Sequence, residues 1–198
     1  MTEKVNEREL VLAILMSVTK EEEYSHIAIQ NVLTKYQYLE KNKRAFITRV
    51  SEGTLERMIE LDYIIDQFSK VKVSKMKPVI RNIMRLSVYQ LKYMDSIPVS
   101  AACNEAVKLT ERKGFRNLKG FVNGVLRNIA RNIDNLPKPE GEICQVMSVK
   151  YSCPLWLVEK IFNQFGREKC EEILSDSLKP HPTFIRANSL KITADDLA

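Results

Sequence analysis

The 198-residue sequence is poor in glycine and proline, with 6 and 7 residues, and this excludes collagen-like and low-complexity chains. Hydrophobic residues make up 44% and charged residues 28%, the composition of a globular protein with a core. The longest uninterrupted apolar run, residues 10–16, is well short of the roughly 20 residues that cross a bilayer. The first residues also lack the basic and apolar stretches of a secretory signal. We therefore expect no membrane span and a cytoplasmic location.

Cysteine and histidine are too few and too scattered to form a metal or catalytic centre. The four cysteines include no Cys-x-x-Cys pair and no metal-ligand spacing: Cys103, Cys144, Cys153 and Cys170. The two histidines stand without a nearby cysteine or acid at ligand spacing. The sequence has no glycine-rich phosphate loop, and nothing near Cys153 would lower its pKa. We expect structural cysteines, no metal and no catalytic residue in this chain.

Positive charge is concentrated in the middle of the chain. Residues 41–139 carry 20 basic and 9 acidic side chains, whereas acids outnumber bases in both flanking parts. Residues 70–92 and 112–131 contain no acid at all. A localised basic zone of this kind indicates a polyanionic partner, usually a nucleic acid.

Apolar residues recur at helical spacing along nearly the whole chain, with one long helical pattern over about residues 38–68. Pro78, Pro98 and Pro154 each precede a strongly periodic stretch, which predicts three helix starts with proline in the first turn. No alternating strand pattern precedes the last fifteen residues. The predicted fold class is all-α.

A linker at residues 133–141, with two prolines and a glycine, interrupts the periodicity. We place a domain boundary there, between residues 1–135 and 136–198. Three shorter helical patterns follow: 143–151, 155–165 and 168–178. Residues 183–188 read as a short extended segment, and Thr193 with Asp196 reads as a helix start. The chain therefore resembles the front part of a longer polypeptide.

The segment 116–133, treated as one helix, divides into an apolar face and a basic face. Five polar side chains fall within a sector of about 120°: Arg116, Lys119, Asn123, Arg127 and Arg131. A merely solvated face is the alternative, but solvated helix faces usually interleave both signs of charge. We expect these side chains, with Lys113, to face outward, unneutralised, and to contact RNA phosphates.

The preceding helical pattern, residues 78–93, is apolar nearly all round and predicts a central, buried helix. Arg85 within it either pairs with a buried carbonyl or carboxylate or contacts a phosphate. Lys77 and Arg81 lie nearer the start of the helix and are better candidates for an RNA surface.

Three blocks of sequence resemble the NusB-like RNA-binding family. They are IMRLSVYQL at residues 83–91, IPV at 97–99 with NEAV at 104–107, and FVNGVLR at 121–127. The family includes the bacterial antitermination factor and the N-terminal domain of the ribosomal RNA small-subunit methyltransferase B. The resemblance covers about residues 5–133 and implies a bundle of two three-helix halves.

The same resemblance implies two places for RNA contacts, the first helix and the start of the last helix of the bundle. In this sequence the implied residues are Arg8, Arg116, Asn117 and Lys119. Arg8 stands among glutamates, where an antitermination factor often has an arginine-rich opening. Phe121 lies at the edge of the apolar sector, where it either packs into the core or, if exposed, stacks on a base.

Residues 151–158, Phe165 with Gly166, and residues 182–188 resemble the connector that precedes the catalytic domain in the methyltransferase branch. This implies the N-terminal region of an enzyme that uses S-adenosylmethionine to methylate carbon 5 of a cytosine in 16S ribosomal RNA through two cysteines. The cofactor and those cysteines would belong to a C-terminal domain, so the chain alone would bind no cofactor and be inactive. The implied partners are 16S ribosomal RNA, that catalytic domain and a ribosomal protein. The alternative is an antitermination or protein-interaction module without enzymatic activity.

Overall fold

The computed structural model describes residues 5–179, 185–188 and 190–197, and every regular element in these ranges is a helix. This confirms the predicted all-α class. The α-helices are α1 (Glu7–Lys20), α2 (Ser25–Lys35), α3 (Lys41–Glu56), α4 (Met58–Phe68), α5 (Pro78–Tyr93), α6 (Val99–Arg112), α7 (Lys119–Arg131), α8 (Ile143–Lys150), α9 (Leu155–Asp176) and α10 (Ala194–Leu197). Short 3-10 turns include η2 (Arg116–Leu118), directly before α7. None of the helices in the described ranges is long and apolar enough to span a membrane.

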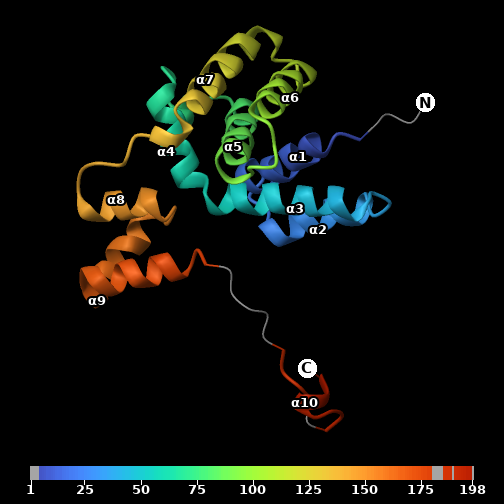
Figure 1. The fold of residues 1–198 in the computed structure, drawn as a ribbon, viewed down its shortest axis with the longest axis vertical. Helices are drawn as coiled ribbons and strands as arrows, with labels where there is room; N and C mark the ends of the chain where they lie inside the picture. Colours follow the sequence, from blue (N-terminus) through green and yellow to red (C-terminus); the bar gives the residue numbers. More distant parts are fainter. Residues whose placement is uncertain (1–4, 180–184, 189, 198) are drawn as a thin grey trace.

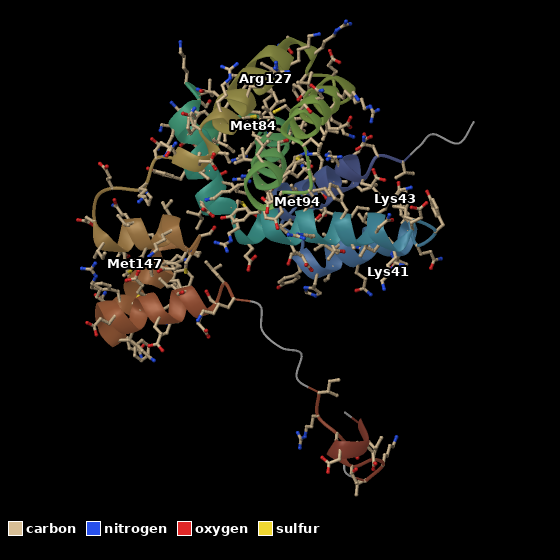
Figure 2. All side chains as sticks on the ribbon, in the orientation of Figure 1. Lys41, Lys43, Met84, Met94, Arg127 and Met147 are labelled. Carbon is tan, nitrogen blue, oxygen red and sulfur yellow. The ribbon has the colours of Figure 1, made fainter. Side chains whose placement is uncertain are left out.

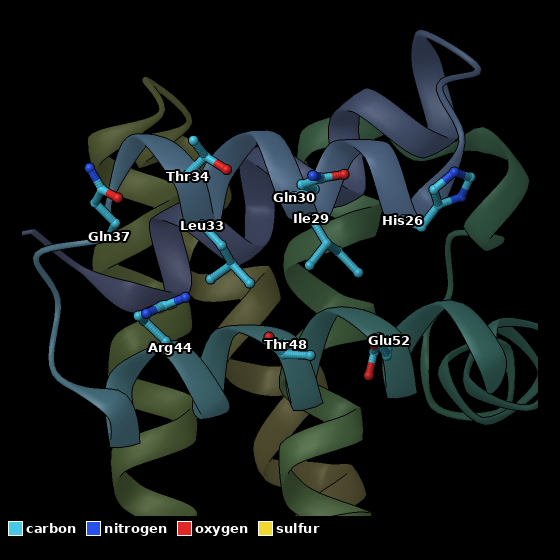
Figure 3. Close-up of a pocket in the computed structure, with 9 residues that line it drawn as sticks. All are labelled: His26, Ile29, Gln30, Leu33, Thr34, Gln37, Arg44, Thr48 and Glu52. Atoms are coloured by element: carbon cyan, nitrogen blue, oxygen red, sulfur yellow. The ribbon is translucent and has the colours of Figure 1, made fainter. Parts of the chain in front are cut away.

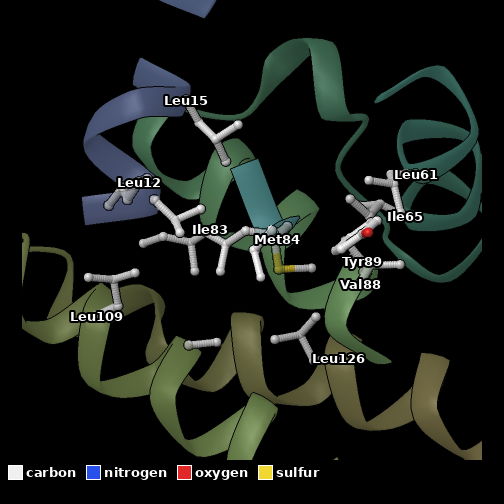
Figure 4. Packing of buried hydrophobic residues seen from close by; sticks show 14 of the residues in the cluster. Leu12, Leu15, Leu61, Ile65, Ile83, Met84, Val88, Tyr89, Leu109 and Leu126 are labelled. Carbon is white, nitrogen blue, oxygen red and sulfur yellow. The ribbon is translucent and has the colours of Figure 1, made fainter. Parts of the chain in front are cut away.

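Helix α5 is the central element of the bundle, as its all-round apolar pattern predicts. It packs against α1, α3, α4, α6 and α7 (Figure 1), and residues 82–90 are all buried. Figure 4 shows its Ile83 and Met84 between α1 and the pair α6 and α7. The two predicted halves correspond to α1–α3 and α5–α7, with α4 packed against α5 and α7.

The three predicted helix starts are correct, but only one proline lies inside its helix. Pro78 occupies the first turn of α5. Pro98 and Pro154 are instead the residues just before α6 and α9, in an extended conformation with ψ near 137° and 134°. Proline fixes φ near −65°, which suits either place, so the sequence identifies the start to within one residue.

The long helical pattern over residues 38–68 forms two helices, because the backbone leaves helical geometry at Arg57, the residue between α3 and α4. Near this break α3 lies very close to α5. A Cβ added at Gly53 would lie 2.1 Å from the hydroxyl oxygen of Tyr89. Only glycine permits this approach of the two helices.

Arg85 is a buried ion-pair partner and not a phosphate contact. Its guanidinium donates to both carboxylate oxygens of Asp62 on α4, and also to Asn82 one turn earlier on α5. The amide of Asn82 in turn donates to Thr19 of α1. Arg85 and Asn82 are therefore matched by partners on α4 and α1, as burial of a charge requires, whereas Ser87 and Gln90 donate to carbonyls of α5 itself.

A second, smaller hydrophobic cluster joins α8 and α9. Its buried members are Met147, Tyr151, Val158, Cys170 and Leu174, and Met147 is labelled in Figure 2. Helix α8 lies against α4 of the bundle. There the amide of Ile59 donates to Ser152 Oγ at 3.1 Å, and the Tyr63 hydroxyl donates to the Lys138 carbonyl at 2.8 Å. The boundary at residue 135 stays a prediction; Leu136 packs against the bundle and Ile143 against the second cluster.

Helix α9 contains a break at Gly166, where φ is 77° and ψ is 176°. This agrees with the two separate helical patterns predicted on either side of residues 166 and 167. Within the predicted extended segment, residues 185–188 form neither helix nor strand, and residues 183 and 184 lie outside the described part. Thr193 caps α10, since the Asp196 amide donates to its hydroxyl at 3.2 Å.

Candidate nucleic-acid interface

The predicted basic residues at the start of α7 face solvent but are paired with carboxylates. Arg116 and Lys119 have side-chain exposures of 83% and 49%, and both lie near Glu111 Oε1, at 3.9 Å and 3.0 Å. Lys113 Nζ lies 2.5 Å from Glu9 Oε1 on α1. The expectation of outward side chains is met, whereas the expectation of unneutralised charge is wrong at these three positions.

The reason for the pairing lies outside the basic segment of the sequence. Glu111 lies near the end of α6, directly before the acid-free stretch. The turn between α6 and α7 brings η2 and Lys119 back beside its carboxylate. Glu9 lies more than a hundred positions away in sequence and reaches Lys113 because α1 runs beside α6. The hydrogen bond from Lys119 lowers the pKa of the Glu111 carboxyl, which favours its ionised form beside the two cations.

The remaining predicted RNA contacts at this end of the bundle differ in accessibility. Asn117 is exposed, and Lys77 is exposed with its ammonium 5.2 Å above the ring of Phe115. Arg81 is half-buried. Phe121 is partly buried and packs against the core cluster, which favours the packing role over base stacking.

Arg8 points toward the bundle. Its Nε donates to Gln90 Oε1 at 2.8 Å, and its guanidinium lies 5.1 Å above the Phe46 ring. Burial lowers the pKa of Arg8, and the coulombic effect of Glu105 opposes this. These contacts hold the side chain between α1, α3 and α5 and give it a structural role in the described chain.

Arg127 and Arg131, on the second half of α7, are predicted contacts whose charge is left available, as is that of Lys77 before α5. Both are exposed, and among the described residues neither has a carboxylate within ion-pair distance. Arg127 Nε donates to Asn123 Oδ1 at 3.0 Å on the same helix face. Figure 2 labels Arg127 on α7. Of the basic side chains predicted on this face, the two furthest along α7 therefore keep their charge open to a ligand.

Two hollows meet at Arg127, between α6 and α7. One, of about 340 Å³, is lined by Val99, Ser100, Cys103, Arg127, Ala130 and Arg131. The other, of about 380 Å³, is lined by Asn104, Val107, Lys108, Lys119, Gly120, Asn123 and Arg127. No acidic side chain lines either hollow. We call the two hollows together the α6–α7 groove.

Gly120 and Gly124 lie on the same face of α7, and nothing in the described chain requires glycine at either position. A Cβ added at Gly120 or Gly124 would meet no atom within 4 Å, and neither residue has a positive φ. Gly124 lies in the helix interior, where glycine costs roughly 0.5–1 kcal/mol relative to alanine, and Gly120 lies in the first turn. Neither backbone geometry nor packing within the described chain explains that cost.

A further hollow of about 460 Å³, which no sequence pattern predicts, lies between α2 and α3 (Figure 3). Ile29 and Leu33 of α2 form its apolar part, while Arg44 and Glu52 of α3 bring opposite charges to its rim. The hollow carries charges of both signs and holds no cluster of reactive groups, so its lining indicates neither a particular ligand nor a reaction.

The cysteines have the environment of structural residues. Cys103 and Cys170 are buried, and burial raises the pKa of both thiols. Burial also raises the pKa of the Cys153 thiol. A nucleophilic cysteine needs a lowered pKa, so these three thiols are not activated.

Fold, basic face and sequence together define a helical bundle of known type: the chain belongs to the NusB family, whose model matches residues 5–131. The chain is 31% identical over 198 residues to the probable ribosomal RNA small subunit methyltransferase B of Bacillus subtilis, covering 98% of this chain and 43% of that protein. The chain thus spans less than half the length of that relative. It is also 30% identical over 125 residues to the transcription antitermination protein NusB of Acetivibrio thermocellus, covering 63% and 86% of the two chains.

Among solved structures, the fold is similar to that of a crystal structure of the antitermination factors NusB and NusE in complex with double-stranded RNA. The TM-score is 0.58 at 21% identity, and the match covers 63% of this chain and 93% of the other. This likeness confirms the NusB-like bundle predicted from the sequence.

Proposed function

We propose that this chain is the RNA-docking, N-terminal region of an S-adenosylmethionine-dependent methyltransferase that modifies carbon 5 of a cytosine in 16S ribosomal RNA. The observation that carries the proposal is the extent of the methyltransferase match. It runs over 98% of the chain and so includes α8 and α9, whereas the match to the Acetivibrio NusB covers 63%. The connector helices favour the methyltransferase branch of the family.

In this proposal the chain contributes binding and orientation, and the chemistry belongs to a catalytic domain beyond it. Nucleotide-like cofactors bind at the carboxyl ends of parallel strands with glycine-rich loops. The described residues form no strand, and we therefore place the S-adenosylmethionine site in that further domain. We expect the coding sequence to continue past Ala198 into a cofactor-binding domain with two cysteine motifs. Translation that ends at Ala198 would contradict the enzymatic part of the proposal.

The RNA-docking part is tested by measuring affinity for a labelled 16S ribosomal RNA fragment between about 50 and 200 mM salt. Contacts to Z phosphates of single-stranded RNA give a log-log slope of about −0.7Z. The triple variant R116E, K119E and R127E is expected to lose binding with unchanged helical content. The control K160E, R167E and K169E changes the same charge on α9 and is expected to bind normally. Wild-type affinity in the first variant would contradict the proposal.

A protein-interaction or antitermination role is the second candidate, and the match to NusB proteins over most of their length favours it. One similar solved structure contains NusB together with a protein, NusE. If this is the main role, RNA affinity will be weak and insensitive to salt, and a protein partner will co-purify with the chain.

A further inference from the structure

We infer that the α6–α7 groove holds the backbone of a single RNA strand, with Arg127 and Arg131 on its phosphates. Gly120 in the lining of the groove, and Gly124 on the exposed helix face beside it, would be the points of closest approach. The inference rests on the proposed function and adds the location of the strand. It moves the main contact from the start of α7 to its second half.

The charge distribution is the first argument. At the start of α7 the basic side chains of Arg116 and Lys119 share Glu111, so a ligand there competes with a carboxylate. In the groove Lys108 is likewise paired, with Glu105 at 2.8 Å. Arg127 and Arg131 have no such partner among residues 5–179, and their guanidinium groups can donate in pairs to phosphate oxygens.

The glycines are the second, independent argument. On a helix of 100° per residue, Gly120 and Gly124 fall with Arg127 and Arg131 within a sector of about 60°. Both glycines are exposed and have open space at the Cβ position. A bare helix face directly before the two arginines lets a bulky strand lie on the helix backbone, with the guanidinium groups at one end of the contact. Contact with RNA would explain why glycine occupies two positions where the helix itself does not require it.

The lining of the groove favours RNA over a protein partner. Ser100, Asn104 and Asn123 supply hydroxyl and amide groups that bind phosphate and ribose oxygens, and acids are absent from the lining. The apolar lining residues are small, with two valines and one alanine beside the buried Cys103. From Gly120 to Arg131 the helix rises about 16 Å. The groove therefore suits a short stretch of a strand.

The first test uses a single-stranded oligouridylate of about ten nucleotides as the probe, together with the 16S fragment. We expect R127Q with R131Q to weaken binding about tenfold or more and to make the salt slope shallower by about 1.4. The matched control K160Q with R167Q removes two exposed charges from α9 and is expected to bind as the wild type does.

The second test uses G120A and G124A, whose expected effects on folding and binding have opposite signs. Alanine removes the helix penalty of glycine, so each variant is expected to unfold at a higher temperature. Each is also expected to bind the oligonucleotide several-fold more weakly, because a methyl group occupies the contact face. Misfolding would lower the unfolding temperature as well as the affinity, so it cannot produce higher stability together with weaker binding.

The outcomes separate the inference from the proposed function. If the arginine and glycine variants bind RNA normally while R116E with K119E does not, the groove assignment is wrong and RNA docking stands. If the wild-type chain binds no RNA, both are wrong. If the glycine variants keep RNA affinity but lose self-association in sedimentation, the groove holds a second copy of the chain and the inference is overturned.

Discussion

Arg85 and Asp62 form a two-point ion pair that joins the central helix to α4. Arg85 Nε donates to Oδ1 at 2.7 Å and Nη2 donates to Oδ2 at 2.6 Å. The side-chain exposure is 7% for Arg85 and 30% for Asp62, so the cation is the more deeply buried partner. Through Asn82 the same guanidinium is linked to Thr19 of α1.

The substitution D62A is expected to destabilise the bundle by about 3 kcal/mol. Removing the carboxylate leaves the buried Arg85 charge without its main partner, and a broken buried pair typically costs about 3–5 kcal/mol. The lower end applies because water reaches Asp62. Urea unfolding followed by circular dichroism measures the change. The control K169A removes the exposed pair with Glu172 and is expected to change stability by less than about 1 kcal/mol; equal losses in both variants would contradict the assignment.

The substitution G53A is expected to lower the free energy of unfolding by about 1–3 kcal/mol, because the new methyl group would overlap the Tyr89 ring. G124A makes the same chemical change at an open helix position and is expected to raise stability by about 0.5–1 kcal/mol. Thermal unfolding of the two variants side by side gives the comparison. A shift of the same sign in both would show that contact with Tyr89 does not control the effect.

The substitution G166A is expected to destabilise the α8–α9 unit by about 1–3 kcal/mol. With φ of 77° and ψ near 180°, Gly166 occupies a backbone region that is essentially closed to residues with a Cβ. Amide hydrogen exchange is the suitable measurement. Exchange is expected to speed up in residues 143–179 and to stay unchanged in α5. The neighbouring change R167A serves as the control, and unaltered exchange in G166A would rule out strain at this position.

Glu105 is expected to make the fold acid-sensitive. Hydrogen bonds from Lys108 and Asn6 lower the pKa of its carboxyl in the folded chain, and partial burial opposes them. A pKa below the unfolded value gives stability that is fully present above about pH 4.3 and is lost as the pH falls through the folded pKa. E105Q is therefore expected to flatten the loss of stability between neutral and acidic pH. A pH series of urea unfolding, with E159Q as an exposed control, tests this.

The sequence predicts the helices well because local rules govern them. Prolines mark the starts of α5, α6 and α9, and the apolar pattern of residues 78–93 indicates a buried helix before any contact is known. The sequence does not predict the break at Arg57, because the apolar period continues across it and only the backbone angles there interrupt the helix. The close contact of Gly53 with Tyr89 also depends on how α3 crosses α5.

The candidate site was harder to predict, because its electrostatics depend on residues from different helices. Five polar positions, four on α7 and one in η2, follow from helical geometry alone. The partners that neutralise some of them do not, since Glu9 reaches Lys113 only in the folded bundle. Ser100 and Asn104 of α6 likewise become part of the groove only when α6 and α7 pack together. Gly120 and Gly124 could have indicated the site from the sequence, because two glycines four residues apart lower the stability of a helix and suggest another role.

The position of Glu111 beside Arg116 and Lys119 makes this carboxylate an internal counterion. A phosphate arriving at the start of α7 would displace it, and the protein would exchange one anion for another without releasing bound salt ions. The salt dependence of binding reports only the ions set free, so these two cations would add little to it. The number of lysines and arginines on α7 therefore overstates the electrostatic attraction that this helix exerts on a transcript.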